Sequence, residues 1–478
     1  MRIYNKLFLS SLLLLSLFSC KKVIDIPEAD LIGGETALKT VGYNEQAIIG
    51  AYAATGIEMA ILMNATLADE VKVAEFYNAG TTHEWQYGST DVGLRDNFTA
   101  TTPNFRVIDR VNRVLQALPG ADSTKAGDNS LRLKLKGEAL FLRALSHFEL
   151  YRFYCGNYDP DGLAMPYMET PSIDPQGRIK MSVYFGKMSA DVAAAKDLLP
   201  NNLTDISRAT KLAASALQAR IALYSRDWAN AETYSTEYIN AIPLATMANF
   251  SGIWTDANTN EQAFRLVRTS SFGGRIGSLW RGTSANASAI GTVTWRPSDK
   301  MWAAFDQVND VRFSSYFKDE LTLATSGRGT RLIYKYAGTA YATPNENVAN
   351  AKVFRTGEMY LIRAEARAEQ NKFTGANSAE SDINALRAAR ITGYTNVVFV
   401  TKADAIDAVI SERFKELAYE GHRFWDLKRR GLPVQRLASD APTTNAATLP
   451  AGNFRFLLPI PQPEILANNL MVQNPGYN

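Results

Sequence analysis

Three glutamates recur at every fourth residue in the stretch SERFKELAYEGHRFWDLKRRG, which spans residues 411–431. The spacing of Glu412, Glu416 and Glu420 places their carboxylates on one face of a predicted helix. Paired carboxylates can serve as general acid and base, as in glycosidases, when different surroundings separate their pKa values. Here the carboxylates lie among cations that give them similar surroundings: Arg413, Lys415, Arg423 and Lys428. We therefore interpret the three glutamates as a charged face that ties this helix to its neighbours, not as catalytic residues.

A glycine turn follows these glutamates. Gly421 comes after a predicted helix and can adopt the left-handed conformation that ends one. Residues 423–430 then predict a second short helix, in which Asp426 and Arg430 form an i, i+4 ion pair. His422 lies at the turn, where a surface or capping role is favoured over metal binding.

The rest of the sequence carries no recognisable catalytic, metal or cofactor motif. Its three histidines, His83, His147 and His422, form no HxxxH or HxH pair, so we expect no metal site. Phosphate-loop, GxSxG and HExxH motifs are missing, and GGRIG at 273–277 lacks the flanking strand and helix of a dinucleotide loop. A formal charge of +3 offers no basic surplus for nucleic acid. We expect neither a cofactor nor a nucleic-acid partner.

Helical periodicity covers much of the chain, so helices must position the charged residues of the stretch 411–431. Apolar residues at steps of three and four predict a long helix over 131–154. Similar patterns predict helices at 41–55, 104–118, 182–199, 207–224, 228–240, 356–370, 376–390 and 403–419. Irregular segments lie between them, at residues 157–175, 250–298, 331–355 and 436–453. Within these segments we predict a strand at 263–267 and a hairpin in 331–355. The predicted fold class is mainly α, with long irregular insertions that contain short β-hairpins.

Three of the predicted helices share a repeated pattern. Each contains an alanine that is followed, nine positions later, by an aromatic residue near the turn to the next helix and, twelve positions later, by a small residue. The three sets are Ala144–Phe153–Gly156, Ala219–Trp228–Ala231 and Ala364–Phe373–Ala376. This spacing resembles the tetratricopeptide unit, in which small residues let two helices approach and an aromatic ring closes the turn. Because the sets start 75 and 145 residues apart, and not about 34, long insertions must separate the helix pairs.

The first twenty residues resemble a bacterial lipoprotein signal. A short basic region precedes an apolar stretch at 7–18 that is too short to span a bilayer by itself. The segment ends in Leu-Phe-Ser-Cys, in which Phe18 replaces the usual small residue. We predict that residues 1–19 are a signal peptide, with an uncleaved anchor as the alternative.

Cys20 is then the predicted site of lipidation, followed by a tether over residues 20–40. Acyl chains such as palmitate would hold the protein at a membrane, since each buried methylene contributes about 0.8 kcal/mol. Cys155 is left as a lone thiol among aromatic residues, which is more typical of a packed side chain than of a nucleophile.

The C-terminal stretch resembles the signature of the SusD/RagB family, outer-membrane nutrient-binding lipoproteins of Bacteroidetes. The matching residues are Glu412-Arg413, Glu416-Leu417-Ala418, Glu420-Gly421, Arg423 and Asp426-Leu427-Lys428. The chain end FRFLLPIPQPEILANNLMVQNPGYN resembles the family's closing segment. The N-terminal half adds Phe141-Leu142-Arg143-Ala144, Tyr151-Arg152-Phe153-Tyr154, Met165-Pro166 and Ile24-Asp25-Ile26-Pro27 after Cys20. The resemblance covers nearly the whole chain.

The resemblance implies a single SusD-like domain over residues 41–478, with halves at about 41–245 and 246–478. It implies four tetratricopeptide-like helix pairs, the fourth near 403–430, and irregular insertions that carry the ligand. Members of the family are not enzymes. They capture glycans, or in some branches peptides, at the outer cell surface and deliver them to a TonB-dependent transporter of the SusC type.

Ligand-binding residues form no fixed motif in this family, so our candidates come from loop placement alone. Aromatic rings stack on the apolar faces of sugars, while polar neighbours bind the hydroxyls. The aromatic residues predicted to bind ligand are Trp85, Tyr87, Trp280, Trp295 and Trp302. For each ring, packing in the core is the alternative. Two other functions stay open: a surface polysaccharide hydrolase that uses carboxylates, and a scaffold without a small ligand.

Overall fold

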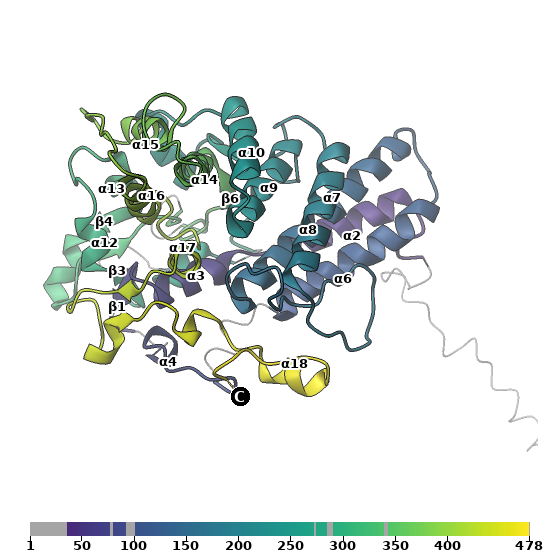
Figure 1. Cartoon of the computed structure of the whole chain (residues 1–478), viewed down its shortest axis with the longest axis horizontal. Helices are drawn as coiled ribbons and strands as arrows, with labels where there is room; N and C mark the ends of the chain where they lie inside the picture. Colours follow the sequence, from purple (N-terminus) through teal and green to yellow (C-terminus); the bar gives the residue numbers. More distant parts are fainter. Residues whose placement is uncertain are drawn as a thin grey trace, which may run out of the picture.

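A computed structural model describes residues 36–76, 80–91, 101–271, 274–283, 290–338 and 343–477. The predicted signal peptide and Cys20 lie outside these residues. The described helices (Figure 1) are α2 Val41–Ala54, α3 Glu58–Leu67, α4 Gly80–His83, α6 Thr101–Ala117, α7 Asp128–Tyr154, α8 Met181–Leu198, α9 Lys211–Ser225, α10 Trp228–Ala241, α11 Met247–Trp254, α12 Asp299–Ala303, α13 Val311–Tyr316, α14 Thr356–Glu369, α15 Ala379–Ala388, α16 Lys402–Glu416, α17 Arg423–Arg430 and α18 Gln462–Ala467. The described strands are β1 Val71–Val73, β2 Gln262–Leu266, β3 Trp295–Pro297, β4 Phe317–Asp319, β5 Arg331–Ile333, β6 Ala351–Arg355, β7 Val434–Gln435 and β8 Thr448–Leu449. The prediction of a mainly α fold with short strands is confirmed.

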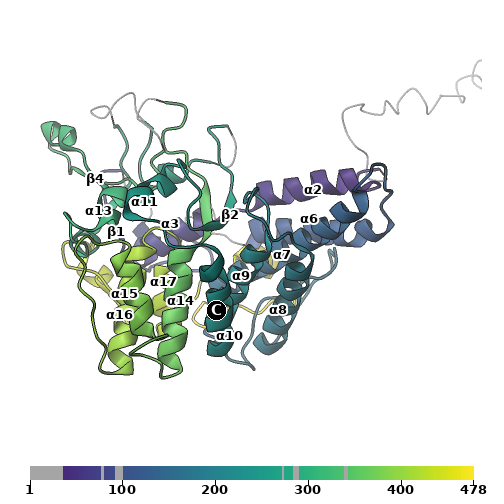
Figure 2. The ribbon, with the colours of Figure 1, turned by 90° about the horizontal axis from the view of Figure 1, so that it is seen from above.

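Consecutive helices pack as pairs: α7 with α8, α9 with α10, and α14 with α15. Helix α8 also packs against α9, and α10 against α14, so helices from both halves of the chain form one continuous arrangement (Figures 1 and 2). The repeated alanines Ala144, Ala219 and Ala364 are fully buried, as close helix packing requires. The assignment of these pairs to tetratricopeptide units stays a prediction.

The strands form four two-stranded antiparallel ribbons: β1–β3, β2–β6, β4–β5 and β7–β8. Of the predicted hairpin within 331–355, the structure shows an isolated antiparallel bridge between Gly338 and Glu346, but not a pairing of β5 with β6. Strand β5 pairs with β4, where Phe317 lies opposite Ile333, and β6 pairs with β2. Phe317 and Ile333 are both buried, so this pairing places two apolar side chains in the core. Local sequence could not show that β5 and β6 belong to different ribbons.

Residues 41–67 are apolar and long enough to cross a membrane by length and composition. They fold instead as two helices, α2 and α3, because the chain leaves the helical conformation after Ala54. Helix α2 packs against α6 and α7, and α3 packs against α17. Helix α3 was not predicted, since its sequence EMAILMNATL shows no polar face.

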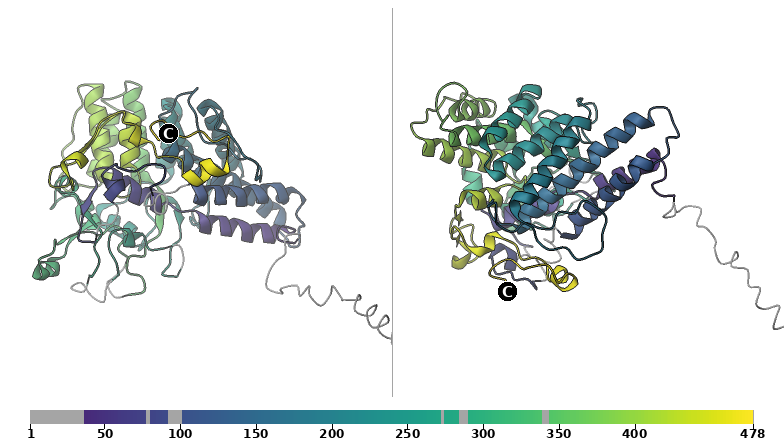
Figure 3. Two further views of the ribbon diagram at one scale, coloured as in Figure 1. Left: turned by 90° about the horizontal axis from the view of Figure 1, so that it is seen from below. Right: turned by 45° about the vertical axis from the view of Figure 1, so that its right-hand side comes forward.

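The helix pairs and the ribbons occupy different sides of the molecule (Figure 2). We call the surface formed by β1, β3, β4, β5 and α12 the insertion face. The C-terminal segment with α18, yellow in Figure 3, runs across a third side of the molecule, from the C-terminal half to the N-terminal half. Its backbone joins the N-terminal half where the Leu458 amide donates to the Phe153 carbonyl. The main apolar core likewise contains residues from both halves.

Candidate functional site

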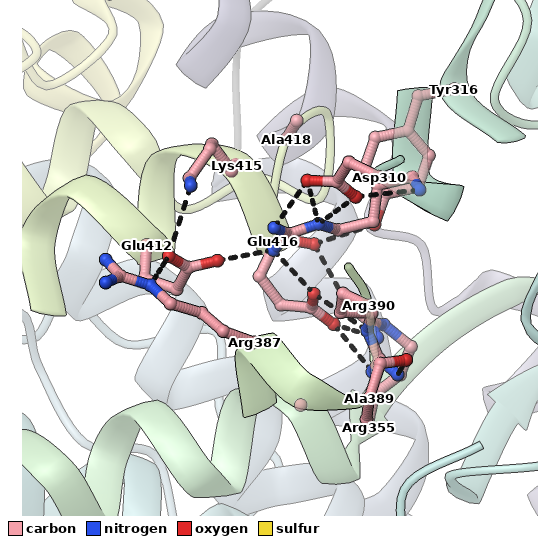
Figure 4. A network of polar contacts seen from close by, with 12 residues as sticks. Asp310, Tyr316, Arg355, Arg387, Ala389, Arg390, Glu412, Lys415, Glu416 and Ala418 are labelled. Atoms are coloured by element: carbon pink, nitrogen blue, oxygen red, sulfur yellow. Dashed lines mark hydrogen bonds and ion pairs between the residues drawn. The ribbon is translucent and has the colours of Figure 1, made fainter. Parts of the chain in front are cut away.

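Glu412 and Glu416 lie in a network of ion pairs (Figure 4) and are fully buried. Glu420 is nearly fully buried. Glu412 binds Arg312 at 2.6 Å, Arg387 at 2.6 Å and Lys415 at 3.2 Å; Glu416 binds Arg355 at 3.0 Å, Arg390 at 3.1 Å and Arg312 at 3.2 Å; Glu420 binds Arg355 at 2.6 Å and Lys335 at 2.8 Å. Because α16 ends at Glu416, Glu420 lies in the following turn and not on the same helical face. The network joins α13, β6, α15 and α16, whose paired residues are up to 104 positions apart.

The electrostatics of this network do not suit these three residues to act as general acids. Burial alone would raise the pKa of Glu412, but the surrounding cations, led by Arg312, hold it at about 2. Burial also opposes ionisation of Glu416, but the charges of Arg390 and Arg355 outweigh burial. They keep the pKa of Glu416 well below its ordinary value. The pKa of Glu420 is lowered in the same way. A general acid must hold a proton near neutral pH, and none of these groups does. The structural interpretation is confirmed.

Several partners expected around these glutamates bind other groups. Arg413 pairs with Asp426 at 2.7 Å, and Arg423 pairs with Asp69 at 2.8 Å. Lys428 donates to the carbonyls of Arg152 and Cys155. Of the four cations expected there, only Lys415 binds one of the three glutamates. Gly421 lets the chain reverse between α16 and α17, and this turn brings Arg413 of the first helix to Asp426 of the second.

Two further expectations about this turn are wrong. Asp426 does not pair with Arg430, because Arg429 and Arg413 occupy its carboxylate, while Arg430 reaches Glu369 of α14 at 2.7 Å. His422 is neither a surface residue nor a side-chain cap: it is buried at the N-cap of α17 without a capping hydrogen bond. Burial and nearby arginines lower its pKa well below the usual range.

The predicted ligand-binding aromatics occupy three separate places. Trp85, Trp280 and Trp295 surround the end of α3: Trp85 donates to the Leu67 carbonyl, and the Trp295 amide to the Trp280 carbonyl. His83, beside Trp85 in sequence, makes an edge contact with the Trp295 ring at 4.9 Å. Tyr87 lies against the C-terminal segment, where its hydroxyl donates to the Arg455 carbonyl at 2.5 Å. Trp302 lies on α12, with the Arg331 guanidinium 4.6 Å above its ring.

All five side chains are buried, with exposed fractions between 1% for Tyr87 and Trp280 and 8% for Trp302. In this conformation none presents an open ring face on which a sugar could stack. Direct ligand contact by these residues stays a prediction, and it requires the surrounding segments to move.

Phe76 is an exposed aromatic residue on the insertion face that sequence reasoning missed. Its side chain is 52% exposed, although its amide is held by a hydrogen bond to the Val293 carbonyl. The neighbouring Ala74 amide binds the Thr294 carbonyl, so Phe76 extends the ribbon whose β3 strand begins at Trp295. The signal available in the sequence was an aromatic residue in a polar turn directly after a short strand, AEFYNAG.

Glu70, beside the tryptophan cluster, makes stability depend on pH. Its Oε1 accepts from the Tyr419 amide at 3.0 Å, but Oε2 is buried without a partner among the described residues. Burial raises the pKa of Glu70 to about 8. The folded protein therefore binds a proton that the unfolded chain releases near pH 4.5, so this contribution is full below pH 4.5 and is lost as the pH rises through 8.

As the pH rises from 5 to 9, the parent protein should lose stability that Glu70→Gln, which mimics the protonated acid, keeps. The free energy of unfolding of the variant relative to the parent should therefore increase by on the order of 3 kcal/mol over this range. Urea denaturation at both pH values measures the difference. Asp69→Asn is the matched contrast. Burial would raise the pKa of Asp69, but the cations Arg423 and Lys300 outweigh burial and hold this pKa at about 2. That variant should lose stability at both pH values. An equal response of Glu70→Gln and the parent to pH contradicts the prediction.

Within the described residues, no three His, Cys, Asp or Glu side chains gather in a way that could hold a metal ion. Two surface pockets among the described residues have volumes of about 430 and 460 Å³. The first lies between α6, the segment at 166–176 and α18. The second lies where α9, α14 and α17 end.

Two family models match most of this chain. The model described as "SusD family" matches residues 250–477, and the model described as "Starch-binding associating with outer membrane" matches residues 40–223. Among curated proteins, SusD-like protein P2 of Formosa agariphila is 25% identical, with 97% of this chain and 98% of that protein covered. SusD-like protein P25 of the same organism is 23% identical, with 98% and 97% covered.

Solved structures share the fold. A SusD superfamily protein from Bacteroides thetaiotaomicron superposes with a TM-score of 0.78 at 22% identity and covers 91% of this chain and 100% of its own. Surface glycan-binding protein A from Bacteroides thetaiotaomicron, solved in complex with laminarihexaose, superposes with a TM-score of 0.72 at 18% identity. That comparison covers 91% of this chain and 99% of the glycan-binding protein.

Proposed function

Because this chain belongs to the SusD/RagB family, we propose that it is a cell-surface glycan-binding protein that delivers its ligand to a SusC-like TonB-dependent transporter. Members of this family are binding proteins, and this protein is likewise a binding protein and not an enzyme. Association with the outer membrane agrees with the description of the family model that matches residues 40–223. Lipidation at Cys20 and an outward orientation are parts of the proposal.

The observation that carries glycan binding is the match of the whole architecture to a protein solved with a glucose hexasaccharide. Both chains are covered almost completely, so the insertions as well as the helix pairs have counterparts. The ion-paired glutamates Glu412 and Glu416 are poor candidates for the general acid of a hydrolase, because the surrounding cations keep their pKa values low.

We place the glycan site on the insertion face at Phe76. A half-exposed ring fixed through its backbone can stack on a sugar at little cost in conformational entropy. Four buried aromatics, Trp85, Trp280, Trp295 and Trp302, belong to the proposed site as rings that contact ligand if the face opens. Tyr87, which packs against the C-terminal segment, is proposed as a separate ligand contact.

We expect Phe76→Ala to weaken glycan binding about tenfold. Tenfold corresponds to about 1.4 kcal/mol, the free energy of burying roughly 55 Å² of apolar surface. Calorimetric titration of the mature protein against a panel of β-glucans, α-glucans and peptides measures the effect. Tyr43→Ala is the control, because Tyr43 is an exposed aromatic residue on α2, away from the insertion face. Unchanged affinity of Phe76→Ala removes this site from the proposal.

The same titration separates the competing functions. Binding without new reducing ends supports a binding protein, whereas turnover supports a hydrolase. Peptide binding alone selects the peptide-specific branch, and a transporter complex without any small ligand supports a scaffold. Individual Trp→Phe changes at positions 85, 280, 295 and 302 then test the buried rings with less damage to the core than alanine, which costs about 3–5 kcal/mol at a buried tryptophan.

A further inference from the structure

A pocket of about 460 Å³ lies on the helical side of the molecule, among helix ends and beside Asn157, the first residue of the irregular segment 157–175. It opens where α9, α14 and α17 end and where α10 begins. Helix α14 starts directly after β6, so its last residue, Glu369, lies at the opposite end of the helix from the β2–β6 ribbon. The volume is in the range of pockets that hold small ligands, about 300–1,000 Å³.

Two arginines of this pocket have hydrogen-bond donors to spare. The Arg226 side chain is exposed and forms no hydrogen bond or ion pair within the described part of the chain. Arg430 uses only Nη1, which reaches Glu369 at 2.7 Å and Glu365 at 3.4 Å. Its Nε and Nη2 bind no other described group. Together these guanidinium groups offer unused N–H donors to a ligand.

The pocket also offers an acceptor and an aromatic surface. Asn157 donates through Nδ2 to the Lys428 carbonyl at 2.9 Å, which orients its amide and leaves Oδ1 available among the described residues. Trp228, at the first position of α10, packs against the core on one side and lines the pocket while half-buried. An aromatic ring beside planar polar groups matches a sugar, which has apolar ring faces and hydroxyls at its edge.

The walls of the pocket are held rigidly. Arg429 binds Glu365 through both terminal nitrogens and Asp426 through Nε at 2.9 Å, so all its nitrogens are engaged. Glu369 is clamped between Arg430 and Lys402. A ligand therefore meets Arg430 and the pocket wall already in position, so only the Arg226 side chain, unpaired within the described residues, must be ordered on binding.

The charge balance favours a neutral ligand over an anion. The C-terminal ends of α9, α14 and α17 converge here, and each carries a partial negative charge of about half an elementary charge. The arginines offset these helix ends and the carboxylates between them. What remains unmatched is hydrogen-bonding capacity, not charge.

We propose that this pocket is a second saccharide site, which takes one or two neutral sugar rings stacked on Trp228 and bound by Arg226, Arg430 and Asn157. The proposal rests on the proposed glycan-binding function and adds a site remote from the insertion face. A short saccharide fits this pocket, whereas a long chain would have to bind across the open insertion face.

Disaccharides test the pocket: maltose, laminaribiose, cellobiose and lactose, titrated up to about 20 mM and followed by calorimetry and saturation-transfer NMR. We expect at least one to bind, with an affinity reduced about fivefold by Arg226→Ala and at least tenfold by Trp228→Ala. Arg226→Ala should leave the fold intact, because that side chain binds no described residue. Arg106→Ala is the matched control, since Arg106 is exposed on α6, outside the pocket.

The outcomes separate this proposal from the function it rests on. The second site is overturned if no disaccharide binds, or if binding survives Arg226→Ala and Trp228→Ala unchanged. Glycan polymers that still bind in that case leave the proposed function standing. Loss of disaccharide binding in the pocket variants, with polymer binding still sensitive to Phe76→Ala, supports both sites.

Discussion

Glu416→Gln should destabilise the folded protein by about 3–5 kcal/mol, because it removes one partner of a buried ion network. The carboxylate faces three guanidinium groups, those of Arg312, Arg355 and Arg390, at 3.0 to 3.2 Å. Glutamine would direct an N–H group at these donors and leave their charges under-compensated. Gly357 allows the close approach: a Cβ there would lie 2.3 Å from Glu416 Oε1.

Urea denaturation at pH 7 measures this loss, with Asp407→Asn as control. Asp407 lies on the same helix but is exposed, so its neutralisation should change stability by less than about 0.5 kcal/mol. The depressed pKa of Glu416 means that its contribution is present above pH 4.5 and is lost as the pH falls through the lower folded value. A variant of normal stability that no longer binds glycan would show instead that Glu416 acts in ligand capture.

Gly421→Ala should cost about 2–4 kcal/mol, the second large effect. Gly421 has φ +80°, a conformation that costs a non-glycine residue about 1–2 kcal/mol. A Cβ would also lie 3.1 to 3.2 Å from the backbone of Ala60 and Ile61 in α3. Such crowding adds about 1–3 kcal/mol, because backbone atoms of a packed helix cannot move aside easily.

Gly431→Ala separates the two causes. Gly431 ends α17 at φ +62°, but nothing lies within 4 Å of the Cβ that alanine would add. Its substitution should therefore show the conformational cost alone, about 1–2 kcal/mol. Equal losses of stability for the two variants in urea denaturation would mean that contact with α3 is unimportant.

The helices that could be predicted are those whose pattern is local. The step of three and four over 131–154 matched α7, which runs from Asp128 to Tyr154, and the pattern at 356–370 matched α14. The left-handed turn at Gly421 and the short helix after it also followed from neighbouring residues. Helix α3 could not be predicted, since a helix buried on nearly all sides shows no amphipathic period.

Partners of charged and aromatic side chains depended on contacts over long distances in sequence. Arg312 lies 100 residues before Glu412, and no spacing rule could pair them. Trp85, Trp280 and Trp295 looked like loop residues because their segments are irregular, yet the fold packs them around the end of α3. Phe76, only three residues beyond β1, stays at the surface.

Residues 411–431 illustrate what the sequence determines and what depends on the tertiary structure. Residues 411–431 alone predicted a helix, a glycine turn and a second helix, and together with the closing segment of the chain they indicated the family, because backbone conformation and motif are local properties. That its carboxylates are buried, ionised and bound to arginines of α13, β6 and α15 was decided by the packing of distant segments. Burial and charge pairing are properties of three-dimensional neighbours, and sequence distance does not specify these neighbours.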